Sequence, residues 1–538
     1  MRVTATLPLL VLALACGRDA VPSGNEGAEP RQGGTLVIAG PSDLGPLNGI
    51  VNSDAFTQEL LNHALFMPLV RLDSALAPEP WLAESWSWEG DSAVTFVLRP
   101  DVAWSDGVPT RARDVAFTFE QSKAEETASP NAGSLADWLS VQVLDSLRVR
   151  FRIRPHIDPL LALASLPVMP AHVLDSIPPA QLRQAAFNRA PVTNGPFRFV
   201  SGSVNDRWEF DANPEFPAPL GGRPHLDRVV WRVIPENSAQ AVELRTGGAH
   251  LILSPSADQL NALDADPSVR AIMRPSRRYV FVGWNGARPP LRDANVRRAL
   301  TLAMNRSEML AALRGGRGEL AVGPIAPHHW AHADDLQPLP FDSAEARALL
   351  DAAGLRDSDG DGVREAADGM PWRIELKIPA NNAFNRDLAE MIRADLAAVG
   401  VAIETRVTEF ATLIDDISSA ERRFDAVIMG WEADLSPALH DLFHSNALGG
   451  PFQLASYSNA LADSLLDAAA AAPDHERAAP FWRELQGVLL RDQPWTFLWY
   501  APDLFAVREE VQGVEMDLRG VFAALPRWWL NEEVAATR

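Results

Sequence analysis

The 538-residue chain contains a single cysteine, Cys16, so it must fold without an intrachain disulfide. Cys16 closes an apolar run at residues 7–15 that follows Arg2. A positively charged start and a short apolar stretch predict a secretory signal, too short to span a bilayer. About 500 residues follow, which is more than one hydrophobic core usually supports. We therefore expect two or three domains, each held together by its apolar core.

The residues around Cys16 resemble a bacterial lipoprotein signal, because Leu-Ala-Leu-Ala precedes the cysteine and Gly17 follows it. The resemblance implies that residues 1–15 are removed and that Cys16 receives a diacylglycerol. An ordinary signal with a cysteine at the cut is the alternative. Residues 16–33 are polar, which predicts a flexible tether. No later segment approaches about 18 consecutive apolar residues, so we expect the lipid to be the only membrane attachment.

The composition of the chain argues against some partners. The net charge is −22, and Lys123 and Lys377 are the only lysines among 48 basic residues. A surface this acidic repels phosphate backbones and anionic lipids, so we expect no nucleic-acid partner. Hydrophobic residues make up 47% of the chain, which is enough for sizeable cores.

Strands and helices alternate along the chain, and this alternation predicts an α/β fold. Short segments with the composition of strands lie at 34–38, 94–98, 229–234, 279–282 and 401–407. Helical patterns cover 54–69, 296–314, 343–353 and 385–399. Gly354 and Gly400 follow the last two patterns and act as helix stops.

The motifs of several enzyme classes are missing from the sequence. It has no Gly-x4-Gly-Lys phosphate loop, no His-Glu-x-x-His zinc helix and no Gly-x-Ser-x-Gly elbow. A lipidated Cys16 could not act as a nucleophile. A Ser/His/Asp arrangement that forms only in three dimensions stays open. We therefore expect a binding module rather than an enzyme, and no cofactor.

Two local clusters offer metal-ligand chemistry. Residues 328–332 contain three histidines in a Pro-rich loop, without the carboxylate or thiol spacing of a metal site, so a solvated loop is favoured. Asp357, Asp359 and Asp361 alternate with Ser and Gly as in the first half of a calcium loop. The match is partial, and a tight acidic turn is the favoured interpretation. We therefore predict no metal site, with these three aspartates as a weak calcium candidate.

The strongest signal is a series of short motifs in a fixed order. Together they resemble the family 5 extracellular solute-binding proteins, the oligopeptide- and dipeptide-binding components of ABC importers, over residues 34–528. The motifs include Leu82-Ala83-Glu84-Ser85-Trp86, Trp104-Ser105-Asp106-Gly107, Asn194-Gly195-Pro196-Phe197, Arg223-Pro224-His225-Leu226-Asp227 and Val296-Arg297-Arg298-Ala299-Leu300.

This resemblance implies a bilobed α/β fold like that of periplasmic binding proteins, with a ligand cleft between two lobes that close about a hinge. Lobe I would comprise residues 34–283, including a small subdomain at about 71–170. Lobe II would comprise residues 284–499, and residues 500–538 would return to lobe I. The hinge crossings would lie at the two boundaries of lobe II.

The resemblance also implies ligand-binding residues in lobe II. Asp434 follows Gly-Trp-Glu-Ala, like the family aspartate that meets the ligand's α-ammonium group, and a carboxylate in a closed cleft would pair with that charge. A solvated loop acid is the alternative. Trp431 would flank the ligand with its indole ring. Tyr457 and Asn459 match the family's Tyr-x-Asn turn near the cleft, although capping of the next helix would also explain them.

The function implied by the resemblance is capture of a peptide, or a similar small solute, and its delivery to ABC permease subunits. We expect a lipid-anchored monomer at the periplasmic or extracytoplasmic face of a membrane. The family also binds nickel chelates, haem, sugars and opines, so these ligands are alternatives. A periplasmic hydrolase or a sensor on the same fold is the alternative from another class.

The lipoprotein signal gives the first testable prediction. Replacing Cys16→Ala removes the only thiol that could carry a lipid, so the variant should leave the membrane fraction while its circular dichroism stays unchanged. The several acyl chains of a mature lipoprotein anchor firmly, whereas a single chain binds only marginally. Fractionation with a carbonate wash measures the effect. A variant that stays in the washed membranes would contradict lipid attachment at Cys16.

Overall fold

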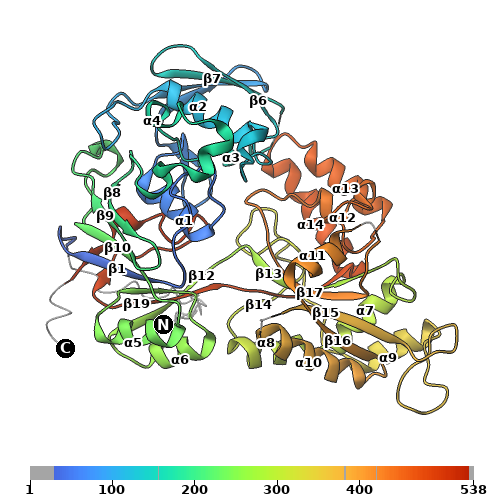
Figure 1. Ribbon diagram of the computed structural model, residues 1–538. Coiled ribbons are helices and arrows are strands. Elements are labelled where there is room, and N and C mark those ends of the chain that lie inside the picture. The colour runs from blue at the N-terminus through green and yellow to red at the C-terminus, as the bar shows by residue number, and fades with distance from the viewer. Residues whose placement is uncertain (1–28, 156, 381–382, 420, 532–538) are drawn as a thin grey trace, which may run out of the picture.

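The computed structural model describes residues 29–155, 157–380, 383–419 and 421–531. The predicted signal and Cys16 lie outside these residues. Two large sheets with their helices lie side by side, and a smaller sheet lies beyond the first (Figure 1). We call residues 29–274 and 503–531, which contain the first large sheet and the smaller sheet, lobe I. Residues 278–500, which contain the second large sheet, are lobe II. No helix within the described residues is long and apolar enough to cross a membrane.

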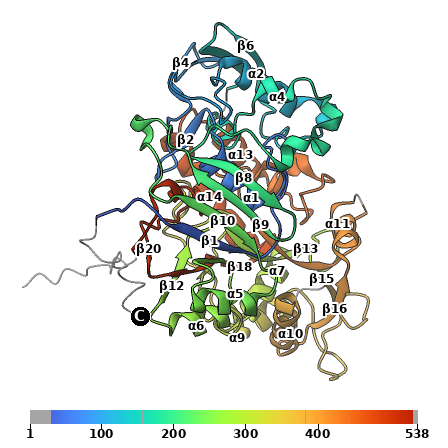
Figure 2. The same ribbon diagram turned by 60° about the vertical axis from the view of Figure 1, so that its left-hand side comes forward.

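Lobe I is built on a seven-stranded mixed sheet. Its central strand, β1, is parallel to both neighbours, β10 and β11, while the other pairs are antiparallel. Figure 2 shows this sheet with α5 and α6 beside it. The strand order is β12 (Val269–Arg274), β19 (Asp503–Arg508), β11 (Leu251–Leu253), β1 (Thr35–Gly40), β10 (Arg228–Val233), β9 (Arg207–Ala212) and β8 (Phe197–Ser203).

The subdomain of lobe I is a four-stranded antiparallel sheet covered by one long helix. Helix α2 (Ala112–Lys123) packs on β6 and β7, and its buried Phe119 meets Phe151 of β7 edge to face at 5.3 Å. A short hairpin of β2 (Val70–Leu72) and β3 (Pro78–Pro80) leads into it. Its strand order is β4 (Ala83–Trp88), β5 (Ala93–Leu98), β7 (Arg148–Ile153) and β6 (Trp138–Val143).

Lobe II is a six-stranded mixed sheet with helices on both faces. Alternation along β13 explains why both faces are covered: Tyr279 and Phe281 belong to one apolar core, whereas Val282 belongs to the core on the other face. Such a strand must be apolar on both sides. The strand order is β14 (Glu319–Leu320), β18 (Trp495–Tyr500), β13 (Arg278–Trp284), β17 (Ala426–Glu432), β15 (Arg373–Pro379) and β16 (Ala402–Thr408).

The helices divide between the lobes. Those of lobe I are α1 (Ala55–Leu60), which continues as a π-helix (Leu61–Leu65), α3 (Leu161–Ala164), α4 (Ala171–Leu174), α5 (Asn237–Thr246) and α6 (Ala257–Asp264). Those of lobe II are α7 (Ala294–Ala303), α8 (Arg306–Arg314), α9 (Ser343–Ala352), α10 (Ala383–Ala397), α11 (Phe410–Ser418), α12 (His440–Phe443), α13 (Ala460–Ala470) and α14 (His475–Asp492). A short hairpin of β20 (Val511–Gln512) and β21 (Trp529–Leu530) lies near the C-terminus.

The single helix predicted over 296–314 is wrong in one respect, because the structure divides it into α7 and α8. Asn305 separates the two helices, and its side chain accepts a hydrogen bond from the backbone N–H of Glu308. An Asn side chain at this position competes for backbone hydrogen bonds and starts a new helix. Both helices contact β18.

Two chain segments connect the lobes, 275–277 after β12 and 501–502 after β18. β13 pairs with β17 and β18, so residues 278–284 belong to the sheet of lobe II. The first connection therefore lies before the boundary expected at 283/284, because the composition of a strand does not reveal which sheet it joins. The second connection lies within two residues of the expected boundary at 499/500.

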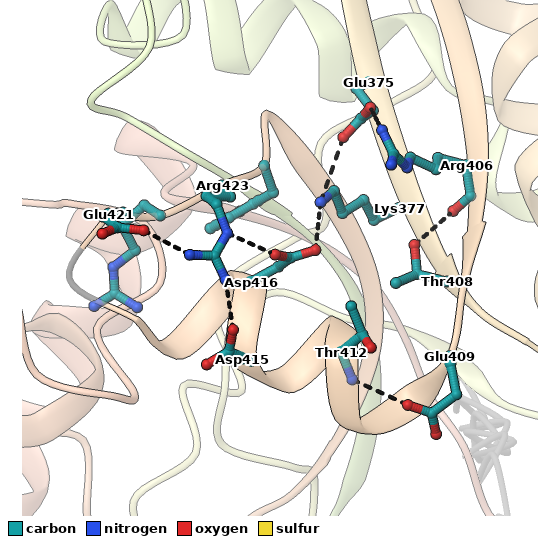
Figure 3. Close-up of polar contacts among 12 residues, drawn as sticks. Glu375, Lys377, Arg406, Thr408, Glu409, Thr412, Asp415, Asp416, Glu421 and Arg423 are labelled. Atoms are coloured by element: carbon teal, nitrogen blue, oxygen red, sulfur yellow. Dashed lines mark hydrogen bonds and ion pairs between the residues drawn. The ribbon is translucent and has the colours of Figure 1, made fainter.

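A buried ion pair ties α11 to the lobe II sheet (Figure 3). The ammonium group of Lys377 on β15 donates to Asp416 of α11 at 2.6 Å, and the two residues are only 4% and 9% exposed. Arg423 donates to the other carboxylate oxygen of Asp416 at 2.9 Å. The hydrogen bond from Lys377 lowers the pKa of Asp416, against the opposing effect of burial.

We expect Lys377→Met to lower the free energy of unfolding by about 1.5–3 kcal/mol, because the buried Asp416 carboxylate loses a charged donor and keeps Arg423. The control is Glu404→Gln, which breaks an exposed pair with Arg373 in the same sheet and should cost less than about 1 kcal/mol. Urea unfolding at pH 7 measures both. Equal losses in the two variants would contradict a structural role for the buried pair.

The stabilisation by this pair should depend on pH. The pKa of Asp416 is lowered in the folded protein, so its contribution is present above the ordinary pKa of about 3.9 and is lost as the pH falls through the lowered value. The difference in unfolding free energy between wild type and Lys377→Met should therefore shrink below about pH 4. A difference that stays constant down to pH 2 would count against this linkage.

Candidate functional site

Three cavities lie near the connection 275–277 between the lobes, and Arg277 borders all of them. The largest, about 500 Å³, lies between the subdomain and the segment 433–439 of lobe II, which we call the Asp434 loop. A second, about 240 Å³, lies between the α1 region of lobe I and the hinge. The third is a narrow apolar pocket within lobe II, with Leu518 of lobe I at its edge.

A separate cavity of about 530 Å³ lies entirely in lobe I, beside β2, β3 and the C-terminal segment. Arginines line it, but each already has a carboxylate partner: Arg71 pairs with Glu79 at 2.6 Å and Arg527 with Glu515 at 2.9 Å. A ligand there would contact one lobe only. The cavities around Arg277 are therefore the better candidate, since closure of two lobes can enclose their contents.

Strand pairing carries the Asp434 loop to the hinge. β17 runs antiparallel to β13 until Glu432 faces Arg278. One residue further, the backbone N–H of Ala433 donates to the carbonyl of Arg277 at 3.1 Å, and the Arg277 guanidinium donates to the carbonyl of Ala433. Asp434 is the next residue. Its position is therefore fixed relative to the segment about which the lobes would move.

Asp434 borders both the 500 Å³ cavity and the narrow pocket, and the residue is exposed. Partial burial raises its pKa, while Arg277 lowers the pKa and Glu432 raises it further. None of the described residues forms a hydrogen bond or close ion pair with this carboxylate. An anionic acceptor without a partner at a cavity wall can bind a cationic donor.

Trp431 lies on β17, two residues before the loop, and borders the narrow pocket. Its indole meets Phe452 edge to face at 5.9 Å and lies 6.4 Å from Trp495 between ring centroids. These contacts fix the ring while leaving it half-buried. The structure therefore brings the predicted pair Asp434 and Trp431 together at one wall.

Tyr457 and Asn459 lie elsewhere in lobe II and do not border the three cavities. Both donate hydrogen bonds of 2.7 Å to Asp492 at the end of α14, and burial raises the pKa of Tyr457 well above its ordinary value. Asn459 also caps α13 by accepting from the N–H groups of Leu461 and Ala462. Asn459 thus has the capping role that the sequence left open, and neither residue lies with Asp434 at the cavity wall.

The three histidines of the 328–332 loop do not face a common point. His329 contacts the carbonyl of Leu435 through Nε2 at 3.0 Å and accepts from the N–H of Ala331 through Nδ1 at 3.1 Å. His332 contacts the carbonyl of Ile325 at 2.7 Å. Burial lowers the pKa of His329, which favours the neutral ring that these two hydrogen bonds require. His329 therefore supports the Asp434 loop.

The acidic turn brings Asp357, Asp359, Asp361 and Glu365 to within 4.8 Å of one another through their carboxylate oxygens. The turn's backbone N–H groups already use several of these oxygens. Asp357 accepts from Gly360 at 2.7 Å, and Glu365 accepts from Ser358 at the same distance. The fourth carboxylate is Glu365 rather than the Asp368 that the calcium-loop pattern suggests. These bonds explain the turn without an ion.

The wall of the second cavity contains charged groups that sequence patterns did not select. Arg274 pairs with Asp503 at 2.5 Å and with Glu59 at 3.4 Å. Burial raises the pKa of Glu59, although Arg274 and two backbone N–H groups oppose the effect, and burial lowers the pKa of His63 to about 4. These residues come from distant parts of the chain, so no local motif could have identified them.

Comparisons with known proteins agree with this architecture. The oligopeptide-binding protein AppA of Bacillus subtilis is 27% identical over 98% of each chain. The structure of that protein in complex with a nonapeptide matches with a TM-score of 0.75 over 94% of this chain and 100% of that one. The dipeptide-binding protein of Escherichia coli is 27% identical over 82% of this chain and 84% of its own length.

The structure of NikZ from Campylobacter jejuni in complex with Ni(L-His) is also similar, with 25% identity and a TM-score of 0.74 over 92% of this chain and 99% of that one. The fold and the cavities between its lobes thus define a two-lobed α/β binding protein, and the predicted fold class is confirmed. The profile of the bacterial extracellular solute-binding proteins, family 5 (middle), matches residues 77–451. The chain belongs to this extracellular family, as its motifs predicted.

Proposed function

We propose that this protein captures a peptide by its free amino terminus and delivers it to the permease of an ABC importer. The observation that carries the proposal is the unpartnered carboxylate of Asp434 at the wall of a 500 Å³ cavity between the lobes. An α-ammonium group would satisfy this carboxylate, and exclusion of water on closure would strengthen the pair. Relatives named for peptide and dipeptide binding support this ligand class.

Trp431 is the second residue to which this proposal assigns a ligand contact. Its half-buried indole ring would provide an apolar face for the first side chain of the peptide, next to the ammonium site. Backbone groups along the cavity would then hold the peptide irrespective of its sequence. The domain division completes the proposal: lobes I and II would close about the segments 275–277 and 501–502.

We further propose that the protein acts by binding alone, as a monomer held to the membrane by a lipid on Cys16. This arrangement would keep the cavity close to the permease and leave both lobes free to move. The family is extracellular, which is consistent with a lipid-anchored position outside the cytoplasm. The acidic net charge of −22 would limit non-specific attachment to anionic headgroups.

A four-way cycle tests the ammonium site. Native mass spectrometry first selects the tightest member of a pentapeptide library with free amino termini. Calorimetry then measures that peptide and its N-acetyl derivative against wild type and Asp434→Asn. We expect either single change to cost about 2–5 kcal/mol of binding free energy and the second change to add little, because both remove one interaction.

The matched control for this cycle is Glu404→Gln, which removes a carboxylate from the exposed edge of the lobe II sheet and should leave the affinity unchanged. Fully additive costs, or wild-type affinity in Asp434→Asn, would show that Asp434 does not hold an ammonium group. A library that leaves no peptide on the wild-type protein would reject the peptide proposal itself.

The raised pKa of Asp434 gives a pH prediction for the same peptide. Only the ionised carboxylate pairs with an ammonium group, and in the ligand-free protein its pKa lies above the ordinary value of about 3.9. The association constant should therefore fall as the pH drops through this raised pKa. Titrations between pH 7 and pH 4 measure the effect, and Asp434→Asn should show a smaller pH dependence. Equal pH dependence in both proteins would contradict the assignment.

A further inference from the structure

The two lobes exchange apolar side chains at one point beyond the cavity. Ile157, in the connection after β7 of the subdomain, packs against an apolar core of lobe II. Leu435, in the Asp434 loop, packs against the main core of lobe I. Each side chain leaves its own lobe to cover the other, so separation of the lobes would expose both to water.

Next to these two residues, Asp158 forms polar contacts across the same interface. One of its carboxylate oxygens lies 2.5 Å from Nε2 of His475, the first residue of α14. The other accepts a hydrogen bond of 2.7 Å from the Ser436 hydroxyl. The Asp158 side chain is 12% exposed, so little water competes for its oxygens. A subdomain carboxylate thus contacts two separate segments of lobe II.

The histidine-containing loop of lobe II holds both partners of Asp158 in place. The Trp330 ring stacks on the His475 ring, with centroids 4.0 Å apart and planes 11° apart. His329 contacts the carbonyl of Leu435, which immediately precedes Ser436. Adjacent residues of one loop therefore position the imidazole and the hydroxyl. This gives the loop a role in the interface that its sequence alone did not indicate.

We propose that Asp158 is a positioning residue that couples the Asp434 loop to closure of the lobes. Ser436 lies two residues after Asp434, so the loop conformation that lets Ser436 reach Asp158 is also the one that presents the Asp434 carboxylate to the cavity. Opening of the lobes breaks the contacts of Asp158 with His475 and Ser436, so the loop loses this polar attachment to lobe I while its contacts with Arg277 and His329 remain. Coupling to peptide binding rests on the function proposed above, whereas the effect on closure does not.

The energetic consequence follows from linkage between closure and binding. A ligand that binds only the closed form has an apparent affinity reduced by the fraction of protein that is closed. Contacts made only on closure raise that fraction without touching the ligand. Asp158 should therefore affect the rate of peptide release more than it affects recognition of the peptide's ammonium group.

The test uses Asp158→Asn, Ser436→Ala and His475→Phe, the last of which keeps an aromatic ring for stacking on Trp330. Asp145→Asn is the matched control, because Asp145 is an exposed carboxylate of the same subdomain whose ion-pair partner, Arg148, lies in its own hairpin. Spin labels at the exposed positions 140 and 404, in the full chain with Cys16→Ala, report the distance between the lobes.

We expect the three variants to shift the ligand-free distance distribution toward longer distances and to release the library-selected peptide about tenfold faster, as loss of a hydrogen bond to a charged group predicts. Asp158→Ala combined with Ser436→Ala should release it no faster than Asp158→Ala alone, because removal of the Asp158 carboxylate already leaves the Ser436 hydroxyl without this acceptor. Asp145→Asn should behave as wild type. Unchanged distances and release rates in Asp158→Asn would overturn the proposal.

Failure of this proposal and failure of the ammonium site are distinguishable. In Asp158→Asn, N-acetylation of the peptide should still weaken binding, because Asp434 is intact. In Asp434→Asn, the ligand-free distances should match wild type, because Asp158 keeps both contacts. If the wild-type protein binds no peptide, the ligand-free distances of Asp158→Asn alone decide: wild-type distances overturn the role in closure, and longer distances support it.

Discussion

Antiparallel pairing between β13 and β17 is the interaction on which the site depends. The pairing continues past the sheet, so Arg277 and Ala433 hydrogen-bond to each other where one strand leaves the hinge and the other enters the Asp434 loop. Hinge and loop are therefore parts of one hydrogen-bonded ladder. If the lobes move about 275–277, a change in the backbone angles there would reach the Asp434 loop through these bonds.

Much of the fold could be predicted because local patterns determine it. The strand expected at 279–282 and the helix expected at 343–353 form within a few residues of their predicted ends, as β13 and α9. Short motifs in a fixed order revealed the family, because each motif forms contacts that the local structure requires. Asp114, for example, accepts from the N–H groups of Arg111 and Ala171 and joins α2 to α4. Local hydrogen-bonding requirements of this kind produce sequence patterns that can be recognised.

What could not be predicted depends on residues that meet only in three dimensions. Arg277, His329 and Asp158 lie far apart in the sequence, yet each contacts the Asp434 loop. Sequence patterns also missed that Tyr457 and Asn459 bind Asp492, because a Tyr-x-Asn turn looks the same whether its side chains face a cavity or a neighbouring helix. The division of residues 296–314 into two helices is different, because Asn305 followed by Glu308 is a local capping pattern that could have been recognised in the sequence.

The pattern of charges explains why a cationic ligand can select one carboxylate, Asp434, in a chain with net charge −22. Most acidic groups near the hinge are already satisfied: Asp503 by Arg274, Glu432 by Arg277 and Arg278, and Asp158 by His475 and Ser436. An ion that enters the cavity would gain little from these groups, since their hydrogen-bonding capacity is in use. Asp434 differs because it borders the cavity, and the partners that hold its loop bind backbone carbonyls or the Ser436 hydroxyl instead of its carboxylate. The loop is thus held by these hydrogen bonds while the Asp434 carboxylate stays available to a ligand.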